Sequence, residues 1–283
     1  MSDRTTAPAT DPTTARAFPR PPGPAHIVLH SAANALADLR AVYTWKTWTF
    51  GWLGRMLAQV TFFALVATML DRPGALTYLV LGNAVMTCVV ESMMVVASSS
   101  WERFLGTMSL LSASPARLVW VFFGRSLQWP LSGAGTSLVA LFALGPAFGV
   151  HWQAGKTPAV VLLVLLTALG SYCFGLFLAA VVVNLPGLRN IVSNSAYLLM
   201  MAVCGVQVPV SFWPQWVGVL AWPLPLTHTL SAVRELAGAG RMGITLTESG
   251  LALLVSAGWF AAAYLTFRRQ ETRGRRTGAL YLT

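Results

Sequence analysis

The sequence predicts an all-α membrane protein with six transmembrane helices, an N-terminal amphipathic interfacial helix and an external re-entrant helical hairpin between spans five and six. Apolar residues (AVILMFWYC) make up 55% of the 283 residues, charged residues make up 10%, and the mean hydropathy is +0.63. A soluble domain carries about 25% charged residues, so a soluble monomer this poor in charge could not cover its surface. Apolar runs of about 20 residues, enough to cross a bilayer, recur along the chain.

Two segments are predicted to precede the membrane domain. Residues 1–25 are rich in Pro, Thr and Ala and have no apolar stretch of the kind a signal peptide requires, so we expect an uncleaved, disordered cytoplasmic tail. Residues 26–48 have apolar side chains every three or four positions, with Asp38 and Arg40 mostly on the other side. This pattern is typical of an amphipathic connecting helix in the cytoplasmic interface. Tryptophans cluster where it would turn into the membrane, at Trp45, Trp48 and Trp52.

The transmembrane domain is predicted over residues 49–267, followed by a basic cytoplasmic tail over 268–283. Arg125 and Pro130 interrupt the long third apolar segment, so we expect its first turns to extend into the cytoplasm. The six predicted spans cover residues 50–70, 75–97, 118–148, 159–183, 191–208 and 246–267.

Residues 209–240 are too interrupted for an ordinary span. Four prolines and three tryptophans fall within the first seventeen of these residues. Two half-length apolar helices separated by a proline-rich turn fit the pattern best. Irregular backbone at membrane depth is tolerated only where protein surrounds it, so the segment is predicted to be a re-entrant or interfacial hairpin.

The basic residues indicate the orientation. With six spans and both ends on one side, thirteen Lys and Arg residues fall in the predicted cytoplasmic parts and four in the external loops. Cytoplasmic loops carry the excess of positive charge in membrane proteins. Both termini are therefore predicted to lie in the cytoplasm, with the protein in the cell membrane. This distribution accounts for most of the net charge of +10, and no basic run alternates with polar base-reading residues. We therefore expect the protein to interact with the lipid bilayer and not with nucleic acid.

Motifs for catalysis and for cofactor or metal binding are not expected. The sequence lacks GxxxxGK[ST], HExxH and GxSxG, and its four histidines are scattered. Cys88, Cys173 and Cys204 lie in apolar stretches without CxxC spacing and are predicted to be buried. The LSGAG run at residues 131–135 is interpreted as small residues that allow helices to approach closely.

Glu91 and Arg125 are the predicted intramembrane polar residues. A carboxylate costs roughly 2.5–3.5 kcal/mol at the centre of a bilayer and less near an interface. Two interpretations of Glu91 stay open. It either acts in the transport pathway or its gating, or it has a structural role, paired with Arg125 or with Ser or Asn on a neighbouring helix.

Several motifs occur in a characteristic order. WERFLGTMSLLSASP at residues 101–115 is predicted to be a short cytoplasmic helix between spans two and three. PVSFWP at 209–214, LPLTH at 224–228 and AVR at 232–234 precede the last span. In this order they resemble the type-2 ABC (ABC-2) export permeases, in particular the membrane subunits of drug and antibiotic exporters. The resemblance covers residues 26–270 and leaves the N-terminal tail outside.

The resemblance implies a permease that pairs with itself or with a sibling chain and docks two separate ABC ATPase subunits, which bind the ATP. The helix at residues 100–114 would be the coupling helix, with Trp101, Glu102, Arg103 and Phe104 contacting the ATPase. The hairpin would lie near the exit, with site residues Trp213, Pro214, Pro223, Pro225, His228 and Arg234.

Several functions are compatible with these features. The expected cargo is a hydrophobic or amphipathic small molecule, with a lipid-linked glycan or another lipid as the alternative in the same class. A stand-alone secondary transporter would need inverted repeats and intramembrane carboxylates, and only Glu91 supports that alternative. A membrane enzyme would need a convergent polar cluster, which the sequence does not indicate.

Overall fold

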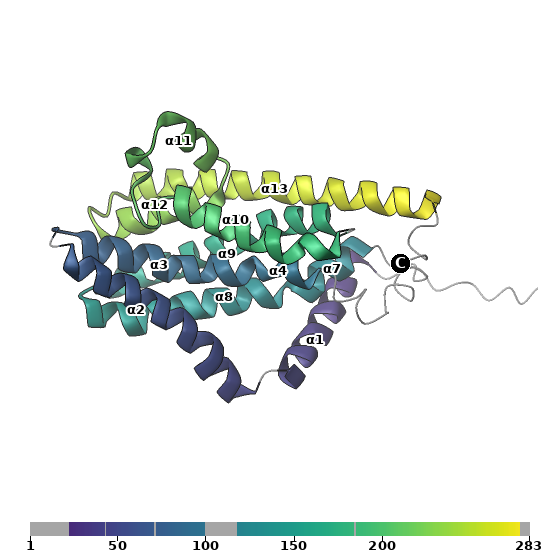
Figure 1. Ribbon diagram of the computed structural model, residues 1–283, viewed down its shortest axis with the longest axis horizontal. Coiled ribbons are helices and arrows are strands. Elements are labelled where there is room, and N and C mark those ends of the chain that lie inside the picture. Colours follow the sequence, from purple (N-terminus) through teal and green to yellow (C-terminus); the bar gives the residue numbers. More distant parts are fainter. Residues whose placement is uncertain (1–22, 43, 71, 100–117, 184, 278–283) are drawn as a thin grey trace, which may run out of the picture.

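The computed structural model describes residues 23–42, 44–70, 72–99, 118–183 and 185–277, and all structural statements below concern these residues. Long helices lie side by side along the longest axis of the molecule (Figure 1). Five segments are long and apolar enough to cross a membrane. They correspond to predicted spans one, two, three, four and six, and cover Thr47–Met69, Ala75–Ser98, Val119–Phe148, Ala154–Val182 and Met242–Gln270.

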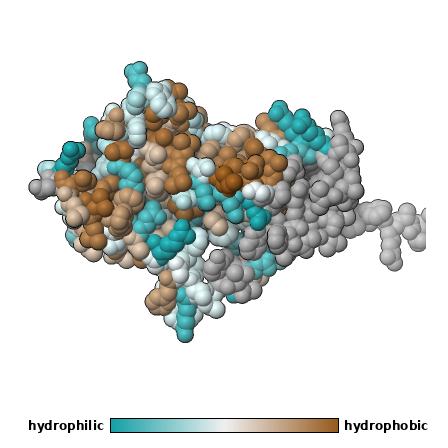
Figure 2. Space-filling view, viewed as in Figure 1, coloured by the Kyte–Doolittle hydropathy of each residue, from teal (hydrophilic) through white to brown (hydrophobic). Residues whose placement is uncertain are grey.

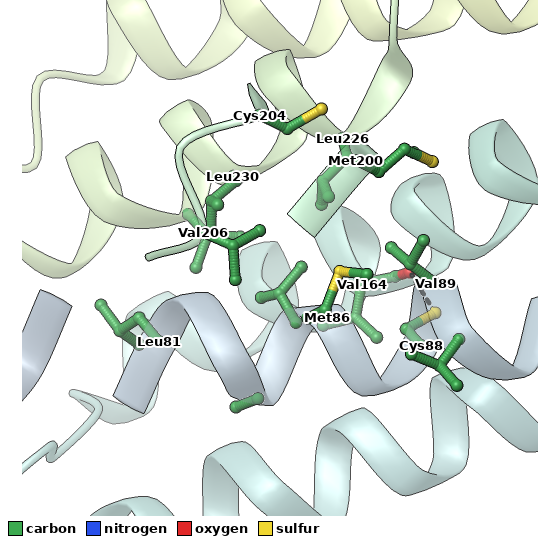
Figure 3. Packing of buried hydrophobic residues seen from close by; sticks show 14 of the residues in the cluster. Leu81, Met86, Cys88, Val89, Val164, Met200, Cys204, Val206, Leu226 and Leu230 are labelled. Carbon is green, nitrogen blue, oxygen red and sulfur yellow. Dashed lines mark hydrogen bonds between the residues drawn. The ribbon is translucent and has the colours of Figure 1, made fainter. Parts of the chain in front are cut away.

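The second span forms the centre of the bundle. It consists of α3 (Ala75–Ser92) and α4 (Met94–Ser98), and every residue from 79 to 92 is buried. Its neighbours are α2 (Gly54–Met69), α8 (Gln128–Val139) and α9 (Thr157–Val182). Figure 3 shows part of the apolar core, where Met86 of α3 is drawn beside Val164 of α9, with Leu226 above them.

Three of the spans are not continuous α-helices. The first begins as a π-helix, η1 (Thr47–Leu53), and the second breaks between α3 and α4. In the third, α7 (Leu118–Ser126) and α8 are separate helices. Pro130 contributes to that break because it has no N–H to donate to the carbonyl four residues earlier. The third span then ends in a second π-helix, η2 (Ala140–Leu144), and a 3-10 turn, η3 (Gly145–Phe148).

The fifth predicted span is shorter in the structure than its apolar pattern indicated. The 3-10 turns η4 (Ala154–Lys156) and η5 (Pro186–Leu188) flank α9, and α10 (Arg189–Val203) follows. With 15 residues, α10 is only about 22 Å long, less than a full membrane crossing. The helix ends where Gly205 adopts a positive φ of 83°. The structure therefore has five membrane-length segments within the described residues, and the fifth predicted span is a partial one.

The segment before the last span contains two short helices. After η6 (Val210–Phe212), α11 (Gln215–Ala221) protrudes from the bundle, whereas α12 (Pro225–Ala237) packs against α9 and α13 (Figure 1). The last helix, α13 (Met242–Thr277), has 36 residues and is about 54 Å long. It therefore continues as a helix through residues 268–277, which the sequence had assigned to the tail.

The N-terminal helix α1 (Pro24–Val42) lies at an angle to the bundle and packs against α7 (Figure 1). The packing is close because Gly124 has no side chain: a Cβ there would lie 2.5 Å from the carbonyl oxygen of Val28. Arg125 donates a hydrogen bond to Asp38 over 2.8 Å and fixes α1 to α7. On the outside of the bundle, Figure 2 shows extensive apolar surface, and Phe62, Met69 and Leu254 are among the exposed side chains.

Candidate functional site

Glu91 is a completely buried carboxyl group inside the second span. It lies in the last turn of α3, about 24 Å along the helix axis from Ala75 and about 10 Å from Ser98. Its exposed fraction is 0%. Met93, two residues later, marks the break between α3 and α4. The acid therefore sits beside a discontinuity in the most enclosed span.

Three polar side chains from two other spans surround this carboxyl group. Ser132 and Thr136 of α8 and the indole of Trp52 in η1 lie close to it. Ser132 and Thr136 are four residues apart, so one face of α8 presents both hydroxyls. The approach of α8 depends on Gly133, where a Cβ would lie 2.7 Å from the carbonyl oxygen of Cys88 and 3.1 Å from the Cβ of Glu91. This contact confirms the interpretation of the LSGAG run as a close helix contact.

The carboxyl oxygens of Glu91 have no partner among the described residues. Neither oxygen makes a hydrogen bond of ordinary length and angle, although the three polar groups are near. The hydroxyl of Thr136 instead donates to the carbonyl of Ser132 over 3.1 Å. Ion pairs within the described residues join Arg125 to Asp38, His228 to Glu248 and Arg241 to Glu235. The pairing of Glu91 with Arg125, one of the two structural alternatives, is therefore not formed.

Arg234 of the hairpin is buried against the start of the second span. Its guanidinium carbon lies 3.5 Å from the ring centroid of Tyr78, and its Nη2 donates to the carbonyls of Tyr78 and Val206 over 3.2 and 3.3 Å. Burial lowers the pKa of Arg234 to about 10, so the side chain stays protonated at neutral pH. The hydroxyl of Tyr78 donates to the carbonyl of Gly205 over 2.6 Å. Arg234 and Tyr78 thus bind α12, α3 and the segment after α10 together.

His228 is a second buried polar residue of α12. Its Nδ1 lies 2.9 Å from Oε2 of Glu248 in α13, and its Nε2 lies 2.9 Å from the carbonyl oxygen of Trp222. The two ring nitrogens therefore connect α12 to Glu248 of α13 and to the backbone just before α12.

The remaining hairpin residues serve packing. Pro225 is the first residue of α12 and contacts α9 at Gly170, where a Cβ would lie 2.6 Å from the proline Cβ. The carbonyl of Pro223 accepts a hydrogen bond from the indole of Trp259 in α13 over 2.6 Å. Trp213 is partly exposed and Pro214 precedes α11. The partners Tyr78, Glu248 and Trp259 were not found in the sequence because they lie 20 to 156 residues from the groups they contact.

Two further predictions concern the rest of the chain. The three cysteines are buried, as predicted. Trp101, Glu102, Arg103 and Phe104, with the whole coupling segment at 100–114, lie outside the described residues. In the described part of the chain, no three His, Cys, Asp or Glu side chains are grouped so that they could hold a metal ion.

The chain was compared with known proteins. A family model described as ABC-2 type transporter matches residues 34–237, which is more than half of the chain. The match begins within α1 and ends with the last residue of α12, so it includes Glu91, His228 and Arg234 and leaves α13 outside. No curated protein matches the chain.

Proposed function

Because the chain belongs to the ABC-2 type transporter family, we propose that it is the permease subunit of an ABC exporter, driven by ATP hydrolysis on a separate ATPase subunit. The family match over residues 34–237 carries this proposal. The chain is a multi-pass membrane protein, since five of its segments are long and apolar enough to cross a bilayer. Its sequence has no GxxxxGK[ST] motif, so the energy for transport must come from a partner.

The proposed cargo is a hydrophobic or amphipathic small molecule that moves outward. The buried core is dominated by aliphatic side chains and contains few charged groups, an environment that suits an apolar cargo better than a sugar or a phosphate. Exposed apolar residues on α2 and α13 require cover by lipid or by a second permease chain, identical or related. We propose a dimer of permeases with two ATPase subunits.

The proposed orientation places both termini in the cytoplasm of the cell. Two helix ends mark the proposed cytoplasmic side. The end of α4 and the start of α7 lie at the end of the bundle toward which α13 runs (Figure 1). Arg268 and Arg269 lie in the last turn of the last span and Arg273 follows it, all toward this same end. Positive charge at that end agrees with a cytoplasmic face on which the ATPase would dock.

Thiol labelling tests this orientation. In a variant lacking the three native cysteines, Gly155→Cys lies in an exposed turn with no neighbour within 4 Å, and Thr272→Cys lies on the exposed part of α13. An impermeant maleimide should label residue 155 and spare residue 272 in intact cells, and should label both after permeabilisation. The reverse pattern would invert the topology.

The exporter function is tested by capture followed by transport. A photo-crosslinking amino acid at position 102 of the full chain should capture an ABC ATPase in the host membrane, which mass spectrometry identifies. Inside-out vesicles with both subunits should accumulate a dansyl probe with a twelve-carbon chain when ATP is supplied. The probe is offered with a neutral tert-butyl end and with a trimethylammonium end. An inactive ATPase should abolish uptake of both. Uptake driven by a proton gradient without ATP would identify a secondary transporter instead.

A further inference from the structure

We propose that Glu91 is the binding site for a positively charged group of the cargo, a protonated amine or a quaternary ammonium attached to an apolar body. The inference rests on the exporter function proposed above and narrows its substrate class. Its starting point is a carboxyl group with 0% exposure and no hydrogen-bond partner among the described residues. A buried carboxylate without a partner is strongly disfavoured, and a cation supplied from outside the chain would compensate it.

Two other ionisable groups of the interior have partners within the chain. Arg234 is half-buried and has two carbonyl oxygens and an aromatic ring as partners, although its Nε makes no hydrogen bond, and His228 contacts Glu248 and a carbonyl. Glu91 is more deeply enclosed than either, and neither of its carboxyl oxygens makes a hydrogen bond of ordinary geometry. Its partner is therefore sought outside the described residues of the chain.

The surroundings of Glu91 favour an organic cation over a metal ion or an anion. The hydroxyl oxygens of Ser132 and Thr136 can accept hydrogen bonds from an ammonium group. A hard metal ion requires about six oxygen ligands, and no group of three metal-ligating side chains occurs in the described residues. The helices next to the polar cluster contribute buried apolar side chains to the core, including Met56 and Val60 of α2 and Ala134 of α8. A small charged group on an apolar body matches this combination.

Trp52 indicates the side from which the site is reached. Its indole lies near the buried carboxyl group, whereas the residue itself is only partly buried. It belongs to the π-helix η1, and such segments occur frequently at functional sites. On the other side of Glu91, the break at Met93 interrupts the second span. A movement of η1 that displaces Trp52 would open the carboxyl group toward the surface of the first span, from which an amphipathic molecule could enter.

A binding measurement tests this site independently of transport. The full chain in phosphatidylcholine nanodiscs is titrated with the two dansyl probes, whose ends are trimethylammonium and its neutral isostere tert-butyl. We expect the wild-type chain to bind the cation about tenfold or more tightly than the neutral probe, a preference typical of a buried charge contact. Glu91→Gln should remove the preference and leave the affinity for the neutral probe unchanged. Glu235→Gln, which alters a carboxyl group paired with Arg241 and remote in sequence from the polar cluster, is the matched control and should behave as wild type.

Equal affinity of the wild-type chain for both probes, or a cation preference that survives in Glu91→Gln, would overturn the proposal. A second measurement needs no variant: a diazirine derivative of the cationic probe should label peptides containing residues 52, 91 or 132–136, and the unlabelled cation should compete better than the neutral probe. Labelling confined to other peptides would also overturn the proposal. Binding needs neither ATP nor the ATPase, so failure of the exporter function would appear only in vesicle transport. ATP-driven uptake by a wild-type chain that binds both probes with equal affinity would refute the Glu91 site alone.

Discussion

The two halves of the second span differ in whether their polar side chains have partners. At its start, Tyr78 stacks on Arg234, and Asn83 exchanges amide hydrogen bonds with Gln207 over 3.1 and 3.4 Å. Near its end, Glu91 is completely buried, and its carboxyl oxygens make no hydrogen bond of ordinary geometry with the described residues. The first arrangement fixes the hairpin to the bundle. The second leaves a charge-bearing group unsatisfied, which is expected of a ligand site rather than of a scaffold.

Both regions use the same packing device, so packing alone does not explain the difference. At Gly82 a Cβ would lie 2.4 Å from the carbonyl of Val206 and 2.9 Å from Nη2 of Arg234. At Gly133 a Cβ would lie 2.7 Å from the carbonyl of Cys88. A glycine permits backbone contact in each case. At the first site that contact brings carbonyl acceptors to Arg234, whereas at the second it brings the hydroxyls of Ser132 and Thr136 near Glu91 without a hydrogen bond of ordinary geometry.

The largest expected effect is the loss of Arg234. Arg234→Met keeps much of the apolar volume but removes the ring contact and two hydrogen bonds to carbonyls. We expect a loss of about 3 kcal/mol in the free energy of unfolding, from charge-assisted hydrogen bonds and a desolvated cation–π contact. Thermal unfolding in detergent, followed by tryptophan fluorescence, measures it. Stability equal to that of the wild type would show that the hairpin is not held by this residue.

The next effect concerns the close approach of α8 to α3. Gly133→Ala inserts a methyl group within 2.7 Å of the Cys88 carbonyl and should destabilise the chain by about 1–3 kcal/mol. Gly135→Ala is the matched control in the same helix, because nothing lies within 4 Å of its Cβ. That control should be neutral or stabilise by up to about 1 kcal/mol through helix propensity. Equal unfolding temperatures for the two variants would contradict the contact.

The contrast between the two regions was only partly visible in the sequence. Hydropathy predicted five of the six spans, because the length and apolar composition of a membrane-spanning helix can be read directly from the sequence. The fifth was overestimated, since apolar residues continue past Val203 while Gly205 turns the backbone at φ 83°. Glu91 stood out as an acid in an apolar run. The pairing of Arg125 with Asp38 was not predicted. The two residues are 87 positions apart, and their contact depends on how α1 packs against α7.

The comparison also predicts a difference in sign. Arg234→Met should destabilise the chain, whereas Glu91→Gln replaces an unpartnered buried carboxyl group by an uncharged amide and should be neutral or stabilise it by about 1 kcal/mol. Unfolding temperatures of the two variants in the same detergent test this directly. Glu91→Gln destabilised by more than about 1 kcal/mol would mean that the carboxyl group is satisfied within the protein after all, and would place Glu91 with the structural residues.

The smallest effect is expected where an ion pair is exposed. Arg241 donates from Nε and Nη2 to the two oxygens of Glu235 over 2.8 and 3.0 Å, and these hydrogen bonds hold the pKa of Glu235 below its ordinary value. A carboxyl group with a lowered pKa in the folded state stabilises the protein above its ordinary pKa and loses this contribution as the pH falls through the lowered value. Arg241→Gln should therefore lower the unfolding temperature slightly at neutral pH, and this effect should shrink at acid pH and disappear below the lowered pKa of Glu235. Since water and salt screen an exposed pair, the small difference at neutral pH should also vanish in about 1 M NaCl.

The effect of Arg234→Met should persist under both conditions. Its partners are backbone carbonyls and a ring, which do not titrate at acid pH and lie away from the solvent. If high salt reduced the two effects to the same extent, Arg234 would have to be as accessible to solvent as Arg241, and the distinction between a buried scaffold and an exposed rim would fail.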